Sequence, residues 1–441
     1  MARLQKPKIF LILAGDAALF YICLYLSLFL RHQKFVDGKM WYFHQFPFLT
    51  VHMLWIVVFY IAGLYELKNF YSIKKTGELV LKTMAAAVTL AVFVFYLIPY
   101  TNIEPKTTLL IDATLLLVLL TAWRHLFWLI SGKTEKTRVL FLGESKEIRY
   151  IAKILDTNPY LGYESAGVMA EVEGNLTEIA KNKNADIIAA SRQIMGNAAT
   201  AKKLYETVLA GISVMDFENF YESLVERIPV YLISEEWFLK NLFEINKKIY
   251  KKIKRAFDLV LALILCAPTI ILFPFLAVLI RMWSKGPVFY RQKRVGKDGK
   301  IFELIKLRTM VDKAEKNGAV WTKQEDPRIT GIGNFLRKTR LDELPQLINV
   351  IRGEMSFIGP RPERPEFVKD LEKEVPHYAM RHIVKPGLSG WAQIKFPYGA
   401  SVEDAMEKLQ YDLYYIKNRS LILDIAITAK TISVVLGSKG R

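Results

Sequence analysis

At 441 residues, with 52% hydrophobic residues and a formal net charge of +18, the chain is long enough for two or three domains. The excess of basic residues favours an anionic partner, and long apolar runs fit lipid headgroups and phosphorylated substrates better than nucleic acid. The two cysteines, Cys23 and Cys266, lie inside apolar runs, which argues against a disulfide framework or a cysteine metal site.

Four apolar segments come first, at about residues 9–30, 46–65, 79–100 and 108–130. Each is roughly 20 residues long, the length that crosses about 30 Å of hydrocarbon. No small-residue cleavage site follows the first segment, so it is interpreted as a retained anchor and not a signal peptide. Residues 1–132 are therefore predicted to form a four-helix transmembrane region. Asp16 and Asp112 are expected at helix ends, satisfied by neighbours.

Basic residues are distributed unevenly around these segments. Nine lie before the first segment, between the second and third, or just after the fourth: Arg3, Lys6, Lys8, Lys68, Lys74, Lys75, Lys133, Lys136 and Arg138. Four lie in the other two loops: Arg31, Lys34, Lys39 and Lys106. The positive-inside rule then places the N-terminus and everything after residue 131 in the cytoplasm.

Residues 137–234 change character. Buried-strand patterns at 138–143, 185–190 and 212–215 alternate with helical patterns, including one at 145–157, which predicts a parallel α/β domain of Rossmann type. Dinucleotide binding is a poor match, because Glu144-Ser145-Lys146-Glu147 follows Gly143 where a phosphate-binding loop needs further glycines. A structural or regulatory scaffold is the preferred interpretation.

A basic stretch at 247–255 leads into an apolar run at 256–280. The run is long enough for a fifth transmembrane helix. Pro268 and Pro274 predict a kink or break, however, and a fifth crossing would place residues 281–441 outside the cell. A helix–break–helix that enters and leaves the same leaflet is the alternative, and both remain open from the residues alone.

The stretch from Arg340 to Leu347 contains the adjacent carboxylates Asp342 and Glu343. Leu344, Leu347, Ile348 and Ile351 follow an amphipathic helical spacing, with Asp342 as the predicted N-cap, Pro345 in the first turn and Gly353 at the C-terminal end. A helix N-terminus would keep a carboxylate ionised. In isolation the pair is most simply interpreted as an N-cap with an acidic first turn. The functional alternative is that one carboxylate acts as a nucleophile and the other binds a metal.

Further patterns surround this stretch. Strand-like segments at 286–292 and 300–308 flank a turn at 296–299, and residues 330–339 are predicted to be helical. Pro360 and Pro362 restrict the backbone around Arg361, which suits an arginine presented to a phosphate, although a solvated turn is equally compatible. A glycine-rich loop covers 386–393, and 421–436 is an apolar helix candidate too short to span.

Together, these motifs resemble the bacterial sugar transferase family, membrane phosphoglycosyl transferases that start exopolysaccharide or O-antigen units on a polyprenyl phosphate. The resemblance covers about 250–441 and is carried by residues 254–258, 286–289, 292–296, 306–310, 341–347, 355–362, 385–393 and 411–415. It implies a mixed α/β monotopic catalytic domain with a re-entrant hairpin at 256–280. The four spans and the degenerate Rossmann-like domain resemble the large, N-terminally extended members.

The resemblance also implies a two-step reaction. Asp342 attacks the sugar-side phosphorus of a UDP-sugar and expels UMP, and undecaprenyl phosphate then takes the phosphosugar from the enzyme. Glu343 is implied as the Mg²⁺ ligand, in line with the preference of Mg²⁺ for carboxylate and phosphate oxygens. The substrate- and phosphate-binding candidates are Lys306, Arg308, Arg361, Asp412 and Arg294. Bilayer lipid, downstream glycosyltransferases and a second copy of the chain are the expected partners, with no nucleic acid, at the bacterial inner membrane and with the catalytic domain in the cytoplasm.

Two departures from the family pattern stand out. Ala267-Pro268 replaces the frequent Ser-Pro at the hairpin break, and residues 394–399 replace an Asn-Gly-Arg run, which leaves the sugar undefined. Two other functions compete. One is a sugar-nucleotide-modifying oxidoreductase built on the α/β domain; the missing glycine loop after Gly143 argues against it. The other is a catalytically silent membrane scaffold; the presence of Asp342, Glu343 and Arg361 together argues against that.

Overall fold

The computed structural model describes residues 5–70, 73–97, 105–131, 136–172, 174–242, 248–311, 314, 326–396, 399 and 401–436. The chain divides into two compact units, Met1–Val225 and Glu226–Arg441. The first unit contains the apolar N-terminal helices and the α/β domain, and the second contains the Asp342 stretch.

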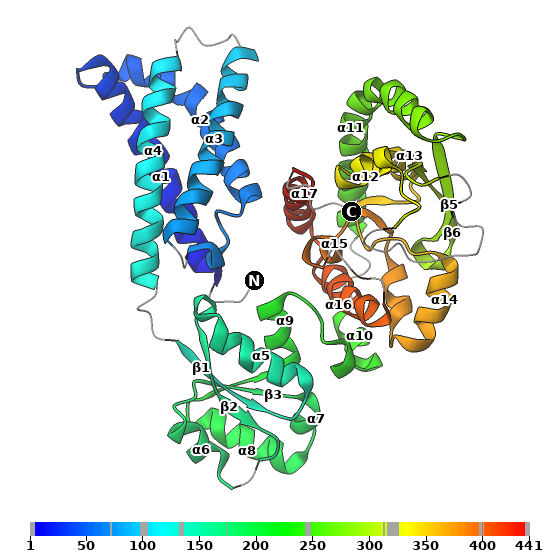
Figure 1. Ribbon diagram of the computed structural model, residues 1–441. Helices are drawn as coiled ribbons and strands as arrows, with labels where there is room; N and C mark the ends of the chain where they lie inside the picture. The colour runs from blue at the N-terminus through cyan, green and yellow to red at the C-terminus, as the bar shows by residue number, and fades with distance from the viewer. Residues whose placement is uncertain are drawn as a thin grey trace. The chain divides into compact units, whose positions relative to one another are not determined.

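Four long helices confirm the four apolar segments: α1 Gln5–His32, α2 Gly38–Ala62, α3 Ile73–Leu97 and α4 Pro105–Ser131. Each is long and apolar enough to cross a membrane. The last three residues of the third predicted segment, 98–100, lie outside the described part of the chain, as do Arg3 and Lys133. Figure 1 shows α1 and α4 side by side, and Gly15 of α1 lies directly against the Trp123 ring of α4.

Buried ion pairs join these helices. Asp16 lies within α1 and not at its end, and it accepts two hydrogen bonds of 2.6 Å from the Arg124 guanidinium. His52 and Asp112 form a second buried contact of 3.0 Å. Both aspartates therefore have partners, as expected, but the helix-end placement is wrong for both, because Asp112 is the eighth residue of α4. A carboxylate within an apolar bundle needs such a partner, because unpaired burial of a charge is costly.

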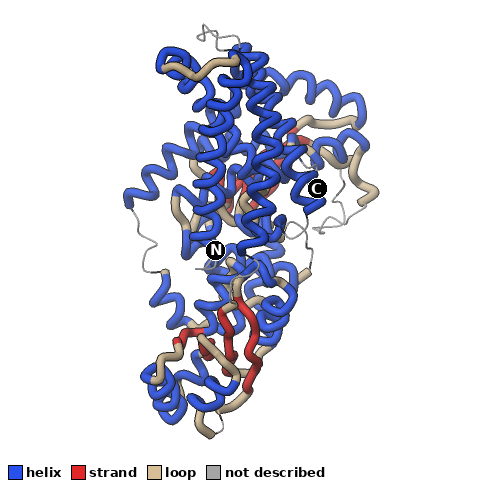
Figure 2. Tube along the Cα trace, turned by 90° about the vertical axis from the view of Figure 1, so that its left-hand side faces the viewer, coloured by secondary structure: helices blue, strands red, loops and turns tan. Residues whose placement is uncertain are grey.

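The α/β domain is a parallel four-stranded sheet of order β2-β1-β3-β4. Its strands are β1 Thr137–Leu142, β2 Tyr163–Met169, β3 Ile187–Ala190 and β4 Ser213–Asp216. Both views show the strands gathered in one sheet (Figure 1 and Figure 2). Figure 1 shows α5 Lys146–Thr157 and α9 Phe217–Val225 on one face and α6 Leu176–Asn182 and α8 Ala198–Leu209 on the other. Strand β2 was not predicted, because its alternating polar residues resemble a loop.

The second unit begins before the predicted start of the catalytic domain. Ile228, Val230 and Ile233, assigned from the sequence to the α/β domain, are buried in the core of this unit. They lie on the chain that leads through η3 Val230–Leu232 to α10 Glu235–Asn241. The unit continues in chain order with α11 Lys248–Trp283, β5 Phe289–Val295, η5 Lys297–Gly299, β6 Ile301–Leu307, α12 Gly331–Lys338, η6 Leu341–Gln346, α13 Leu347–Arg352, β7 Ser356–Ile358, α14 Pro365–Glu374, η7 Tyr378–Ile383, β8 Gly387–Ser389, α15 Trp391–Lys395, α16 Val402–Asn418 and α17 Leu421–Leu436.

Helix α11 contains the apolar run and both of its prolines. Its 36 residues would extend about 54 Å if straight, and Figure 1 shows it changing direction. Arg255 near its start donates to the Val350 and Ile351 carbonyls of α13. Trp283 at its end lies against Gly331, the first residue of α12. Both ends of α11 are therefore attached to the same unit.

A hydroxyl group lies at the α11 proline although the preceding residue is alanine. Thr269 follows Pro268, and its Oγ1 donates to the Leu265 carbonyl over 2.6 Å. Proline has no N–H, so backbone carbonyls one turn before it lose partners. The carbonyl that Pro268 leaves without a helical donor is that of Ile264, so the Thr269 hydroxyl bonds the neighbouring carbonyl and does not replace the missing bond.

Candidate active site

The Asp342 stretch forms a 3₁₀ helix, η6, that continues into α13. Gly353 ends α13 in the left-handed conformation at φ 83°, as predicted. Asp342 is not the N-cap, however. Arg340 occupies that position at φ 59°, and no side chain caps the helix. The predicted apolar stripe is also only partly correct, since Leu347 is buried whereas Ile348 and Ile351 are 40% and 37% exposed.

Asn349 of α13 attaches this segment to strand β6. Its Oδ1 accepts from the Ile305 N–H at 3.2 Å, and its Nδ2 donates to the Glu303 carbonyl at 2.8 Å. A buried side-chain amide that both accepts from and donates to one strand fixes where α13 lies along β6 as well as the distance between them. Lys306, the next residue of β6, is thereby held at the same cavity as Asp342.

The Gly359–Pro362 stretch is positioned by a close approach of two main chains. Gly359 donates to the Ser389 carbonyl, and Gly387 donates to the Pro360 carbonyl. A Cβ on Gly359 would lie 2.4 Å from the Lys385 carbonyl oxygen, so only glycine allows this contact. The Arg361 carbonyl also accepts from Arg381 at 2.9 Å. The prediction of an arginine presented by a rigid backbone agrees with this arrangement.

These elements surround one cavity of about 630 Å³. All seven residues predicted for the site line it: Arg294, Lys306, Arg308, Asp342, Glu343, Arg361 and Asp412. Arg337 and Arg340 also line it, and neither was predicted. Both lie within five positions of Asp342 in the chain, but only the fold of α12 against η6 brings Arg337 to the cavity.

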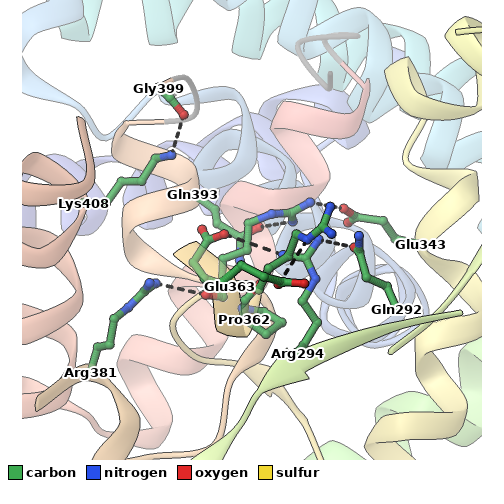
Figure 3. Close-up of polar contacts among 12 residues, drawn as sticks. Gln292, Arg294, Glu343, Pro362, Glu363, Arg381, Gln393, Gly399 and Lys408 are labelled. Atoms are coloured by element: carbon green, nitrogen blue, oxygen red, sulfur yellow. Dashed lines mark hydrogen bonds and ion pairs between the residues drawn. The ribbon is translucent and has the colours of Figure 1, made fainter. Parts of the chain in front are cut away.

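Glu343 is held by two arginines. Its Oε1 accepts from Arg361 at 2.8 Å, and its Oε2 is 3.3 Å from Nη1 of Arg340. The other terminal nitrogen of Arg361 donates to Gln393 Oε1 at 3.1 Å, and Figure 3 shows Glu343 at one edge of these polar contacts and Gln393 nearer their centre. Burial raises the pKa of Glu343, but the two guanidinium charges outweigh it and lower that pKa to about 2. Glu343 is therefore a fixed anion.

Asp342 has the opposite character. Only 7% of it is exposed, and its Oδ1 is buried without a hydrogen-bond partner among the described residues. Burial and the neighbouring Glu343 charge raise the pKa of Asp342 to about 7, against the opposing charges of Lys306, Arg337 and Arg361. The expectation that the helix end would keep Asp342 readily ionised is thus wrong, because no helix N–H group caps it and burial dominates.

Cations surround Asp342. Burial and the nearby Arg294 and Arg337 charges lower the pKa of Lys306 to about 8, while its ammonium lies 5.1 Å from the centre of the Tyr290 ring. Arg337 donates from Nε to Thr309 at 2.8 Å, which leaves its terminal nitrogens out of that contact. A concentration of positive charge at a concave site suits a ligand with several anionic oxygens, such as a diphosphate.

The other predicted residues contact protein groups. Arg294 donates to the Pro362 carbonyl at 2.9 Å and to Gln292 at 2.6 Å (Figure 3). Arg308 donates to the main-chain carbonyls of Ser284 and Lys285, just after α11. Asp412 accepts from Arg381 at 2.9 Å, and burial, its largest influence, raises its pKa to about 6. Arg308 and Asp412 thus connect the cavity wall to α11 and η7.

The residues present fit a magnesium ion only together with a ligand. No group of three or more His, Cys, Asp or Glu side chains that could bind a metal occurs in the described part of the chain. Mg²⁺, however, is commonly bound by one or two carboxylates plus substrate phosphates. Glu343, whose two oxygens also contact Arg361 and Arg340, would supply the carboxylate, and substrate phosphate oxygens would supply the other donors.

Comparison with known proteins identifies the family. The bacterial sugar transferase model matches residues 249–438. A UDP-glucose:undecaprenyl-phosphate glucose-1-phosphate transferase of Escherichia coli K12 is 32% identical over 332 residues, covering 69% of each chain. A UDP-N-acetylgalactosamine-undecaprenyl-phosphate N-acetylgalactosaminephosphotransferase of Aeromonas hydrophila is 42% identical over 237 residues, covering 54% of this chain and 55% of that protein.

A shorter relative from Bacillus subtilis, a putative undecaprenyl-phosphate N-acetylgalactosaminyl 1-phosphate transferase, is 46% identical over 153 residues, or 34% of this chain and 86% of its own length. The chain belongs to the bacterial sugar transferase family. It is an enzyme of the transferase class, with helices long and apolar enough to cross a membrane. The chain matches about half the length of the Aeromonas hydrophila protein and most of the length of the shorter Bacillus subtilis protein.

Proposed function

We propose that the protein transfers a sugar 1-phosphate from a UDP-sugar to undecaprenyl phosphate through a phosphosugar ester on Asp342. The observation that carries the proposal is a buried Asp342 oxygen without a hydrogen-bond partner, in a cavity with Lys306, Arg337 and Arg361. A carboxylate in that position is available for attack, and the cations match the charge of a diphosphate. The names of the relatives support the donor and acceptor classes.

In the first step, an ionised Asp342 oxygen attacks the sugar-side phosphorus of the donor. The bond between that phosphorus and the bridging oxygen breaks, and UMP leaves with the bridging oxygen. In the second step, a phosphate oxygen of undecaprenyl phosphate attacks the same phosphorus. The Asp342–phosphorus bond breaks, the carboxylate is regenerated, and undecaprenyl-diphospho-sugar is formed.

The remaining residues bind and orient. Lys306 and Arg361 hold phosphate oxygens during both steps, and Glu343 fixes Arg361 by the 2.8 Å contact. Glu343 would also hold Mg²⁺ with phosphate oxygens of the substrate; a bound Mg²⁺ neutralises charge on the transferred phosphoryl group. The lipid-linked product would begin an exopolysaccharide or O-antigen repeat unit and pass to downstream glycosyltransferases.

A UMP-release assay on the purified protein, with a panel of UDP-sugars, tests this mechanism. Without lipid acceptor, UMP should appear in a burst equal to the amount of enzyme, and mass spectrometry should find the phosphosugar on the Asp342 peptide. Direct attack by the lipid phosphate would instead give no UMP until both substrates are present, and the Asp342 peptide would stay unmodified.

The proposal includes a re-entrant α11 with the catalytic unit on the cytoplasmic side. Its support is that Arg255 and Trp283, near opposite ends of α11, contact α13 and α12 of one unit. Between them, Ile270, Ile271 and Phe275 are at least 66% exposed, as expected for side chains that contact lipid. Cysteines introduced at Lys240 and Ser284 should be labelled from the same side of the membrane. Labelling from opposite sides would establish a fifth crossing.

A further inference from the structure

Residues 226–242, here called the strap, connect α9 of the first unit to α11 and lie within the second unit. The strap is part of that unit's core. Trp237 is 1% exposed, and Ile228 and Val230 are equally buried, in the same cluster as Leu409 and Trp391. Such burial fixes the strap in place, because removing large apolar side chains from water stabilises their packed position.

The strap makes polar contacts with α15. The Trp391 indole N–H donates to the Glu226 carbonyl at 3.0 Å, and Lys395 forms a 3.0 Å ion pair with the Glu226 carboxylate. Between these two positions α15 carries Gln393, the acceptor for Arg361. Glu226 therefore contacts both ends of the short helix that orients one side of the Arg361 guanidinium.

The strap also contacts the other elements that support Arg361. Arg227 pairs with Glu407, and Ile228 N–H donates to the Gln410 carbonyl, so the strap is bonded to the helix that carries Asp412. Phe238 packs on the His377 ring, with centroids 4.7 Å apart, directly before η7. Residue Arg381 of η7 donates to Asp412 and to the Arg361 carbonyl.

We propose that the strap positions Arg361, with Glu226 and Arg227 as positioning residues that act through α15 and α16. The guanidinium is fixed by Glu343 on one side and Gln393 on the other, and the strap bonds to the helix that bears Gln393. Shared contacts of this kind matter because small displacements of a charged binding group cost large factors in rate or affinity. The proposal rests on the proposed role of Arg361 in binding substrate phosphate.

The test uses the full-length protein in membranes or detergent, with the double variant Glu226→Gln and Arg227→Met. The control is Glu236→Gln, which removes an exposed pair with Lys240 on α10 of the same strap. We expect the double variant to raise the KM for the UDP-sugar about tenfold, with kcat within about twofold of the parent. The control should leave both unchanged. Exchanging the charges, with Glu226→Lys and Lys395→Glu, should recover part of the KM.

The split between KM and kcat distinguishes positioning from folding. A variant that only unfolds in part loses active enzyme, which lowers the apparent kcat at constant KM. Loss of kcat alone, or a KM within twofold of the parent, would overturn the role of the strap. Failure of the proposed function looks different, because the parent itself would then give no burst of UMP.

Discussion

The state of the Asp342 carboxyl should control how the enzyme responds to pH. Attack requires the ionised form, and the pKa of Asp342 is raised from 3.8 to about 7. With that value about a tenth of the enzyme is active at pH 6 and about nine-tenths at pH 8. The rate of the UMP burst should therefore fall about tenfold for each pH unit below neutrality.

Removal of Lys306 provides the critical perturbation, because its positive charge opposes the rise in the Asp342 pKa. An opposite charge at close range typically changes a carboxyl pKa by about one to three units. Lys306→Met should raise the Asp342 pKa further and move the acid limb of the profile upward by about one pH unit. A lower burst rate at every pH is also expected, from the loss of a phosphate-binding group.

Single-turnover UMP release from pH 5 to 9, at UDP-sugar concentrations well below saturation, reports the pKa of the free enzyme and separates these two effects. The control variant is Lys300→Met, an exposed lysine at the turn before β6. It should keep the parent profile. A parent rate that stays constant down to pH 5, or a Lys306→Met profile with an unmoved acid limb, would refute the electrostatic reasoning.

Three other substitutions test separate contacts. Asp342→Asn should preserve folding, because it caps no helix, but lower turnover by several orders of magnitude in the UMP assay. Arg308→Met should lower the melting temperature more than it changes the KM, because Arg308 donates to the carbonyls that follow α11; a large KM change at constant stability would make it a substrate ligand instead. Asp16→Leu should lower the free energy of unfolding of the helical bundle by about 3–5 kcal/mol, because it leaves the Arg124 charge buried without its partner. Adding Arg124→Leu should recover much of that loss. No recovery would show that Asp16 and Arg124 do not stabilise the bundle as a pair.

Seven residues that line the cavity could be predicted from the sequence, but Arg337 and Arg340 could not. Asp342, Glu343 and Arg361 stand in short motifs whose prolines and glycines restrict the backbone locally, and these local effects persist in the fold. The same reasoning predicted β5, β6, α12 and α17, whose patterns lie within single segments. Strand β2 was missed because polar residues interrupt its buried positions.

Long-range effects could not be predicted from these motifs. Arg340 adopts a left-handed conformation that moves the helix start by two residues, which removes the cap expected at Asp342. Arg337 reaches the cavity only because α12 packs beside η6. The exposure of Ile348 and Ile351 could not be predicted for the same reason. An apolar spacing predicts an apolar face on a helix, but it does not identify the neighbouring element that this face contacts.

The division of labour between two adjacent carboxylates follows from their hydrogen bonds. Asp342 and Glu343 are almost equally buried, at 7% and 8% exposure, so burial alone would raise both pKa values. Two arginines contact Glu343, and this converts it into a permanent anion. That anion in turn raises the pKa of Asp342, while the unpartnered Oδ1 has no hydrogen bond that must be broken before attack. Burial first and the Glu343 anion second therefore raise the pKa of Asp342 to about 7, while the arginine pair keeps Glu343 ionised.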